Sequence, residues 1–371
     1  MQQLKLKTTI EEYVLFKDFA DSYKLGPKDL ILTNQSLYKA FLSPLEIPCI
    51  VIFREQFGRG EPNDEMINAI ILEIEQYDFE RVVAIGGGSI VDIAKLLVLE
   101  GVNDIVNVFE QKQSCNKNKE LIVVPTTCGT GSEVTNISIV EIKSKHTKMG
   151  LANDAILPDH AILIPELLRG LPFKYFMTSA IDALIHATEA LVSPKASPYT
   201  DLFSRAAIQS IVTIFQGIVS HGEDYRMDYL AEMLRASNQA GIAFGNAGVG
   251  AVHALSYPLG AAYHVPHGEA NFQFFTPVLD LYHKYHPEGK IQELCLLLAS
   301  ILDVKPSEAI DSLDDLLKRL IPKPKLHEYG MKEEEIVCFV DNVILSQQRL
   351  LKNNYTALTR SDMEAIYRNL Y

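Results

Sequence analysis

The chain has 371 residues, of which 47% are hydrophobic and 22% charged, as in soluble globular proteins of about two domains. Its 34 lysines and arginines against 47 aspartates and glutamates give a net charge of -13, which disfavours nucleic acid and anionic membranes as partners. The N-terminus lacks an apolar signal core and no uninterrupted apolar stretch reaches the length of a membrane span, so we expect a cytoplasmic protein.

The cysteines are scattered along the chain and form no C-x-x-C pair. Their odd number fits a reducing cytoplasm better than a disulfide framework. They are Cys49, Cys115, Cys128, Cys295 and Cys338. We assign none of them a role.

Short apolar runs alternate with helical stretches in the first half of the chain. Strands are predicted at residues 30–33, 47–53, 81–85, 121–124, 138–142 and 161–164, and a helix at residues 90–99. This alternation is typical of a mostly parallel sheet with crossover helices. We therefore assign residues 1–171 to an α/β dinucleotide-binding domain with a Rossmann-like sheet.

Two loops in this half are candidates for cofactor binding. The run from Gly86 to Ser89 joins a predicted strand to a helix, and its glycines would let a phosphate approach backbone amides at the positive end of that helix. The run from Pro125 to Glu133 offers hydroxyls and free amides directly after the next predicted strand, residues 121–124. The plainer alternatives are a strand-to-helix turn, which needs one glycine and not three, and a solvated turn.

The second half has a different period. Apolar residues recur at helical spacing through residues 204–218, 229–243, 291–302, 309–320 and 334–345, with few β-branched runs. We therefore assign residues 172–371 to an α-helical domain that binds metal and substrate.

Four side chains of this half form a candidate metal site. Asp182 and His186 lie four residues apart in a run of helix formers, which places both on one helix face, and His253 and His267 follow. Three imidazoles and one carboxylate leave a divalent ion room for a substrate oxygen, as in catalytic sites. Ordinary core histidines are the alternative. Residues that stop one helix and aim the second donor back are expected at Pro258, Gly260, Pro266 and Gly268.

Together these motifs resemble the iron-dependent alcohol dehydrogenases, relatives of dehydroquinate synthase with an α/β N-terminal and an all-α C-terminal domain. The match runs in a consistent order from about residue 30 to the C-terminus. It rests on Gly86-Gly87-Gly88-Ser89 with Asp92, on residues 125–133, on the Asp182/His186 pair and on His253 with His267-Gly268.

The resemblance implies roles for individual residues. The pyrophosphate and helix end would be held by Gly87, Gly88, Ser89 and Asp92. The adenosine and nicotinamide sides would be bracketed by Thr126, Thr127 and Thr130. Asn63 and Lys148 match positions that contact the dinucleotide, although Lys148 also reads as an ordinary solvated lysine.

Asn34 departs from the pattern of NAD-using relatives. These usually carry an acidic residue there, which pairs with the adenosine ribose 2′-hydroxyl and repels a 2′-phosphate. The neutral amide of Asn34 lacks that repulsion. NAD is the cofactor that the family implies, with NADP as the open alternative.

Iron(II) is the metal that the family implies, and zinc, cobalt and nickel also suit the donor set. The ion would act as a Lewis acid on the substrate oxygen while the nicotinamide exchanges hydride with the carbon. We expect this chemistry in a cleft between the two domains.

Tyr257 occupies a position where relatives often carry a further histidine near the substrate oxygen. A phenol with a reference pKa near 10 donates a hydrogen bond but is a poor proton shuttle at neutral pH. Simple packing of Tyr257 above Pro258 is the alternative. His264 is a candidate relay or carboxylate contact, and Lys195 a candidate carboxylate anchor.

The resemblance favours 4-hydroxybutyrate and succinate semialdehyde as the substrate pair. Other short alcohols, such as butanol, 1,3-propanediol or the alcohol of lactaldehyde, would undergo the same chemistry. A dehydroquinate-synthase-like lyase would surround a phosphorylated substrate with lysines and arginines, which the segment from His253 to His267 lacks, and a non-catalytic nucleotide sensor would lose metal ligands. A homodimer is expected from the family.

Overall fold

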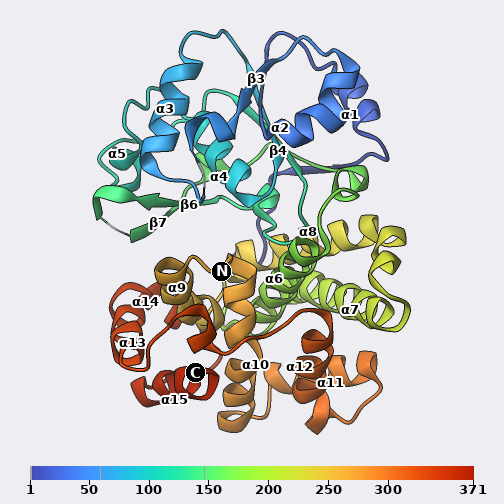
Figure 1. The fold of residues 1–371 in the computed structure, drawn as a ribbon, viewed down its shortest axis with the longest axis vertical. Coiled ribbons are helices and arrows are strands. Elements are labelled where there is room, and N and C mark those ends of the chain that lie inside the picture. The colour runs from blue at the N-terminus through green and yellow to red at the C-terminus, as the bar shows by residue number, and fades with distance from the viewer. Residues whose placement is uncertain (1, 59, 146) are drawn as a thin grey trace. The chain divides into compact units, whose positions relative to one another are not determined.

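The computed structural model describes residues 2–58, 60–145 and 147–371, which fall into two compact units. One unit is Leu6–Leu171, and the other is Pro172–Tyr371 together with the N-terminal segment up to Lys5. That segment packs on helices, since the Lys5 amide donates to Oδ1 of Asn246 at 2.6 Å. The predicted fold class, a parallel-sheet domain followed by a helical domain, is confirmed (Figure 1).

The main sheet of the unit Leu6–Leu171 is parallel, in the order β1-β8-β5-β4-β2-β3. Its strands are β1 (Thr9–Glu12), β2 (Asp29–Thr33), β3 (Ile50–Phe53), β4 (Arg81–Gly86), β5 (Glu120–Pro125) and β8 (His160–Leu163). Thr33 pairs with Phe53, and Gly86 pairs with Pro125. The loops that follow these strands therefore begin at the same edge of the sheet.

One predicted strand does not belong to this sheet. Residues 138–142 lie in β6 (Ile137–Ile142), which pairs antiparallel with β7 (Thr147–Ala152) as a separate two-stranded sheet. The assignment of residues 138–142 to the parallel sheet was therefore wrong, because a partner close in the chain pairs with this strand instead. We did not predict β7 or β1, whose short sequences carry too few apolar residues for a period-two signal.

Both faces of the main sheet are covered. Alternate side chains of β4 enter two different cores: Val82 and Ala84 lie in one, Val83 and Ile85 in the other. The covering helices are α1 (Phe16–Tyr23), α3 (Asp64–Ile74), α4 (Gly88–Leu97) and α5 (Ile105–Phe109), whereas the short α2 (Gln35–Leu37) has no buried residue. Because both faces of the sheet are buried, the sequences of its central strands are continuous apolar runs and do not alternate between apolar and polar residues.

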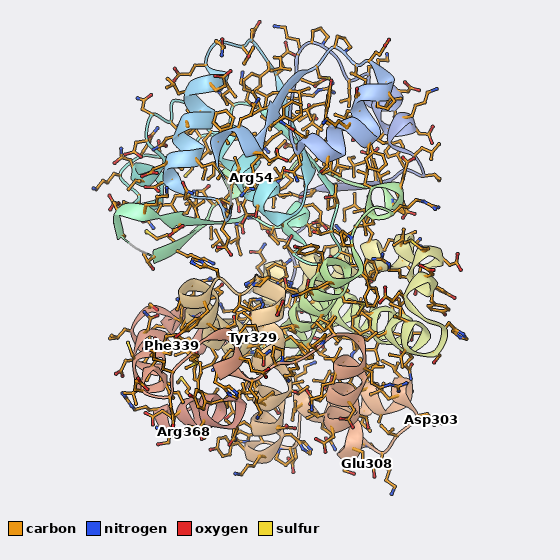
Figure 2. All side chains as sticks on the ribbon, viewed as in Figure 1. Arg54, Asp303, Glu308, Tyr329, Phe339 and Arg368 are labelled. Carbon is orange, nitrogen blue, oxygen red and sulfur yellow. The ribbon has the colours of Figure 1, made fainter. Side chains whose placement is uncertain are left out.

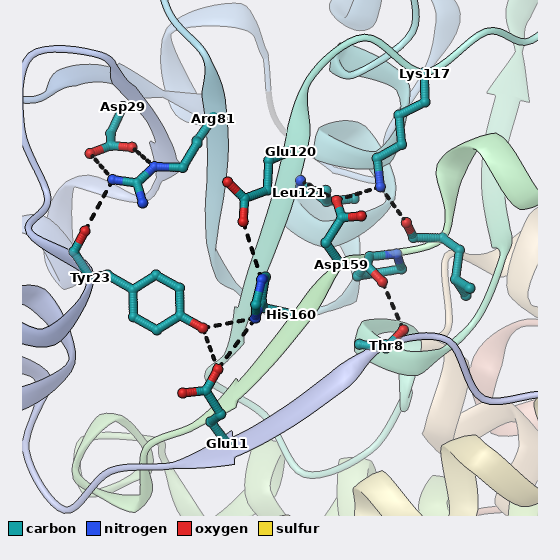
Figure 3. Close-up of polar contacts among 12 residues, drawn as sticks. Thr8, Glu11, Tyr23, Asp29, Arg81, Lys117, Glu120, Leu121, Asp159 and His160 are labelled. Atoms are coloured by element: carbon teal, nitrogen blue, oxygen red, sulfur yellow. Dashed lines mark hydrogen bonds and ion pairs between the residues drawn. The ribbon is translucent and has the colours of Figure 1, made fainter.

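A polar network closes the amino edge of this sheet (Figure 3). At the start of β8, Nδ1 of His160 lies 2.8 Å from the Tyr23 hydroxyl and 3.3 Å from a Glu11 carboxylate oxygen. Its Nε2 lies 3.1 Å from Glu120. One imidazole thus joins β1, α1 and β5 at the edge opposite to the candidate cofactor loops.

The second unit is helical. Its helices are α6 (Phe173–Val192), α7 (Pro198–His221), α8 (Leu230–Ala247), α9 (Ala251–Tyr263), α10 (His267–Tyr285), α11 (Lys290–Leu302), α12 (Ala309–Leu320), α13 (Glu335–Ser346), α14 (Gln348–Leu351) and α15 (Arg360–Leu370). Phe339 of α13 is buried in this unit, whereas Asp303, Glu308 and Arg368 are exposed (Figure 2).

One helix reaches the length of a membrane span, although charged and polar residues interrupt its apolar sequence. By length and composition, α7 is long and apolar enough to cross a membrane. It nevertheless packs against α6 and α8, and its Asp201 and Arg205 form ion pairs with Lys290 and Glu293. These contacts are those of a core helix in a globular unit.

Candidate active site

The four predicted metal ligands come together inside the helical unit. Each of Asp182, His186, His253 and His267 offers one ligand atom, and these atoms lie within 4.8 Å of one another. The closest pair is Nε2 of His253 and Nε2 of His186, at 3.0 Å. An Asp182 carboxylate oxygen lies 3.8 Å from Nε2 of His267.

Exposure differs among these side chains. Those of Asp182, His186 and His253 are only 3%, 6% and 3% exposed, whereas that of His267 is 40% exposed. The cluster is therefore closed on three sides, and a substrate would reach it past His267.

The backbone around His253 and His267 differs in part from the prediction. Pro258 and Gly260 do not stop the helix, because α9 continues to Tyr263 and ends at His264 in the left-handed conformation, with φ of 54°. The predicted turn does occur before His267, where Pro266 is the N-cap of α10 and His267 its first residue.

Gly268 lets α10 approach α6. A Cβ atom at this position would lie 2.2 Å from the backbone oxygen of Thr178, one turn before Asp182. No side chain fits there, so a glycine beside the ligand allows His267 to approach Asp182.

Two residues that we did not predict orient the ligands. Glu189 is buried, and one of its oxygens lies 2.6 Å from Nδ1 of His253. Asn271 donates from Nδ2 to Oδ1 of Asp182 at 2.8 Å. Glu189 lies three residues after His186 and Asn271 four residues after His267, so helical spacing from the ligands was the signal that could have found them.

The electrostatics of the cluster favour an ionised carboxylate. Burial of Asp182 disfavours its charged form, but three adjacent imidazoles and the Asn271 amide outweigh this effect and hold its pKa below the usual value. A negative charge therefore remains in a largely dry site.

The donor set fits a divalent metal ion. Nδ2 of Asn271 lies 3.1 Å from Nε2 of both His253 and His267, in addition to its bond with Asp182. Two histidine nitrogens and one Asp182 oxygen thus surround one small region, which is an arrangement that a cation would stabilise. Three imidazole nitrogens and one carboxylate oxygen suit iron(II) and zinc.

The three remaining candidates of this unit lie in different places. Tyr257 is half-buried on α9, with its ring centroid 6.1 Å from that of His267. His264 is exposed at the end of α9. Lys195 is exposed three residues beyond the carboxyl end of α6, which itself lies about 9 Å of helix rise from His186, and it does not join the cluster.

In the other unit, the two predicted cofactor loops touch each other. Gly87 is the N-cap of α4 and Gly88 its first residue. A Cβ atom at Gly87 would lie 3.2 Å from Thr127 Cγ2, and one at Gly88 would lie 2.8 Å from Thr130 Cγ2. Close approach, not a positive φ, is therefore what requires these glycines. Ser89 follows in the first turn of α4, and Thr126 is buried at the end of β5.

Asp92 contacts the protein itself. Its Oδ1 accepts from Ser132 Oγ at 2.8 Å and its Oδ2 from the Ile139 amide at 3.1 Å, and burial raises its pKa. Asp92, which we predict to help hold the pyrophosphate and the helix end, has both oxygens engaged in joining α4 to the 125–133 loop and β6.

Lys95 is a further residue of this region that we did not predict. It is fully buried, and its Nζ donates to Ser132 Oγ at 2.7 Å, Thr135 Oγ1 at 3.1 Å and the Ile137 oxygen at 2.6 Å. Burial lowers its pKa to about 8. A lysine in an amphipathic helix is usually predicted to be exposed, so nothing in the sequence indicates that Lys95 is buried and bonds to residues 132–137.

Asn63 and Lys148 are both engaged with other residues. Asn63 caps α3, and its side-chain oxygen accepts from the Met66 amide at 2.9 Å. Lys148 of β7 forms an ion pair with Glu61. Asn34 directly follows β2 and makes no side-chain capping bond to α2.

Comparisons with known proteins agree with this geometry. Residues 16–165 match the family described as iron-containing alcohol dehydrogenase, and residues 176–371 match the C-terminal domain of the Fe-containing alcohol dehydrogenase family.

Individual relatives cover most or all of the chain. It is 52% identical over 371 residues, all of both chains, to 4-hydroxybutyrate dehydrogenase of Clostridium kluyveri. It is 31% identical over 316 residues to the NADPH-dependent butanol dehydrogenase of Clostridium saccharobutylicum, covering 80% of this chain and 78% of the relative. The crystal structure of sulfoacetaldehyde reductase from Bifidobacterium kashiwanohense in complex with NAD+ superposes with a TM-score of 0.86 at 24% identity, covering 100% and 99% of the chains.

Proposed function

The chain belongs to the iron-containing alcohol dehydrogenase family, and we propose that it transfers hydride between NAD(H) and the pair 4-hydroxybutyrate and succinate semialdehyde. The convergence of Asp182 and three histidines, in a chain 52% identical to a 4-hydroxybutyrate dehydrogenase over its whole length, carries this proposal. Iron(II) is the proposed metal because of the family, with zinc as the alternative that the donor set also accepts.

When bound, the divalent ion polarises the substrate oxygen and the nicotinamide accepts or donates the hydride. The protein's own side chains hold and orient these partners. Asp182 contributes a carboxylate whose pKa is held below its usual value, and Glu189 engages Nδ1 of His253 so that Nε2 faces the other proposed ligands. Burial of the cluster excludes water, which strengthens each electrostatic interaction.

Oxidation of the alcohol removes a hydride from carbon and a proton from oxygen, so the proton needs a route to solvent. We propose that Tyr257, one turn after His253 and beside the more exposed His267, donates a hydrogen bond to the substrate oxygen. His264, exposed at the end of the same helix, is the residue that we propose as proton relay to solvent.

The cofactor is assigned to the loops of the unit Leu6–Leu171. Its pyrophosphate would meet Gly87, Gly88 and Ser89 at the start of α4, where backbone amides and the helix dipole attract anions. The adjacent loop would contribute Thr126, Thr127 and Thr130. Asn63 and Lys148 remain proposed contacts, while Asp92 and Lys95 would act by holding the 125–133 loop.

The decisive assay uses protein purified anaerobically with iron, supplied with NADH and, in turn, succinate semialdehyde, butyraldehyde and lactaldehyde. We expect the highest kcat/KM with succinate semialdehyde. If the protein reduces none of the three aldehydes, the dehydrogenase assignment is wrong. If it prefers butyraldehyde, only the substrate assignment is wrong.

A His267→Ala variant tests the metal centre separately. We expect it to lose bound iron, measured by metal analysis after gel filtration, and to lose turnover, because one of four ligands is gone. NADH binding should stay near the wild-type value. An unchanged iron content would contradict the assigned ligand set.

We also propose that the protein is a cytoplasmic homodimer. All the cysteines are free, which suits a reducing compartment. The dimer follows the family resemblance, and light scattering after size-exclusion chromatography tests it.

A further inference from the structure

The end of β2 lacks the acidic residue that would select NAD. A carboxylate from the segment after the neighbouring strand β3, that of Glu55, lies beside the end of β2. β2 and β3 are parallel neighbours, and Thr33 pairs with Phe53, the last residue of β3. Asn34 and Arg54 therefore begin the loops that follow these paired ends, with Glu55 one residue further. Glu55 is exposed, and its Oε1 accepts from the Gln35 amide at 3.1 Å.

The contact between Glu55 and Gln35 brings a carboxylate beside residue 34. Asn34 is the N-cap of α2, and its side chain accepts no capping hydrogen bond. The amide of the next residue, Gln35, donates to Glu55, so a negative charge lies one residue from Asn34 although Asn34 itself is neutral.

The Glu55 carboxylate lies at the same edge of the sheet as the candidate cofactor loops. β4, which carries the glycine loop, lies next to β2, and Thr33 Oγ1 donates to the Ile85 oxygen at 2.9 Å across that pair. Along the carboxyl edge the order is β5, β4, β2, β3. A dinucleotide whose pyrophosphate meets the start of α4 would extend its adenosine ribose toward the ends of β2 and β3.

Arg54 is the rival at the same place, because a guanidinium there would attract a 2′-phosphate. Its Nη2 donates to the Gly60 oxygen within its own loop, whereas its Nε is buried without a hydrogen-bond partner among the described residues. Glu55 makes its bond to the end of β2, and Arg54 makes its bond within the loop that follows β3.

We infer that Glu55 determines coenzyme specificity: its carboxylate accepts a hydrogen bond from the ribose 2′-hydroxyl of NAD(H) and repels the 2′-phosphate of NADP(H). The inference rests on the proposed use of a nicotinamide dinucleotide. The selective carboxylate would then come from the segment that follows β3, since the end of β2 carries none.

The test is equilibrium titration with NADH and with NADPH, followed by the fluorescence of the reduced nicotinamide, for which the absence of tryptophan gives a favourable background. Wild-type protein should bind NADH more tightly than NADPH. In Glu55→Gln, which keeps an oxygen for the Gln35 amide, we expect the ratio of the NADPH to the NADH dissociation constant to fall about tenfold or more, because a like-charge contact is lost.

Three further variants sharpen the result. Asn34→Asp in the Glu55→Gln background should restore discrimination, since it returns a carboxylate to the same region. Glu80→Gln, which removes an exposed charge just before β4 at the opposite edge, should leave the ratio unchanged. Arg54→Met should also leave it near the wild-type value.

An unchanged ratio in Glu55→Gln would overturn the inference, as would wild-type protein that binds both nucleotides equally. A specific loss of NADPH binding in Arg54→Met would assign the site to the guanidinium and overturn it as well. If wild-type protein binds neither nucleotide, the proposed function fails, and that result is distinct from the others.

Discussion

The carboxylate of Glu189 lies 2.6 Å from Nδ1 of His253, on the side of the imidazole away from the other ligands. The other oxygen of Glu189 accepts from the Val252 amide at 2.8 Å, so both carboxylate oxygens hold the start of α9. This pair leaves Nε2 facing the other candidate ligands, and a carboxylate on Nδ1 would increase the basicity of Nε2 toward a metal ion.

Glu189→Gln should weaken metal binding about 10- to 100-fold, because an amide cannot stabilise the imidazole as a carboxylate does. Competition with a chromophoric chelator measures the change, with cobalt(II) as a spectroscopic probe of the altered ligand field. Glu308→Gln, on the exposed surface of the same unit, is the matched control. Equal metal affinities in the wild type and Glu189→Gln would show that Glu189 does not act on the metal centre.

Gly268→Ala should destabilise the helical unit and reduce bound metal. Its Cβ would lie 2.2 Å from the Thr178 oxygen, which forces α10 away from α6 and His267 away from Asp182. We expect a loss of about 1–3 kcal/mol in the free energy of unfolding by denaturant. Gly170→Ala, where nothing lies within 4 Å, serves as the control. A variant with wild-type stability and metal content would mean that the two helices need not approach so closely.

Gly88→Ala should weaken NADH binding and leave the metal content unchanged. The added Cβ would lie 2.8 Å from Thr130 Cγ2 and would push the 125–133 loop from the start of α4. Nucleotide fluorescence gives the dissociation constant, and Gly26→Ala, whose nearest atom would lie at 3.7 Å, is the control in the same unit. Loss of metal in Gly88→Ala would contradict the division of the two sites between the two units.

Lys95 predicts a specific pH dependence of stability. Burial lowers its pKa to about 8 from the ordinary lysine value of 10.5, so between these two pH values the unfolded chain binds the proton that the folded chain does not. Stability therefore rises with pH in this window, by about 2 kcal/mol between pH 8 and pH 10.

The comparison with Lys95→Met isolates this contribution, because tyrosines and other lysines titrate in both proteins. Unfolding by denaturant at pH 8 and pH 10 gives the four free energies required. We expect the free energy of unfolding of the wild-type protein to rise relative to that of the variant as the pH rises from 8 to 10. A constant difference between the two proteins would show that Lys95 keeps its proton throughout that range.

Local patterns carried much of the prediction. The four-residue spacing of Asp182 and His186, and the glycine run between an apolar strand and a helix, are properties of neighbouring residues, and the structure places these residues accordingly. The second unit follows the same logic, since helix α12 spans residues 309–320 as its apolar period indicated.

The strands with weak local signals were missed. β1 forms an edge strand only because β8 offers a partner, and β6 leaves the main sheet because β7 is close enough in the chain to pair with it. Both outcomes depend on which segments compete for the same hydrogen bonds. Period-two patterns in one segment contain no information on that competition.

The sequence by itself determined the kinds of elements, their order and the chemical types of the ligands, because helical and strand periods act over a few residues. Only the tertiary structure decided that Glu189 holds His253, that Asp92 braces a loop and that Glu55 bonds to the amide after Asn34. Each of these contacts joins residues that are 20 or more positions apart. Their distances depend on helix packing and strand register, which form only when the whole unit folds.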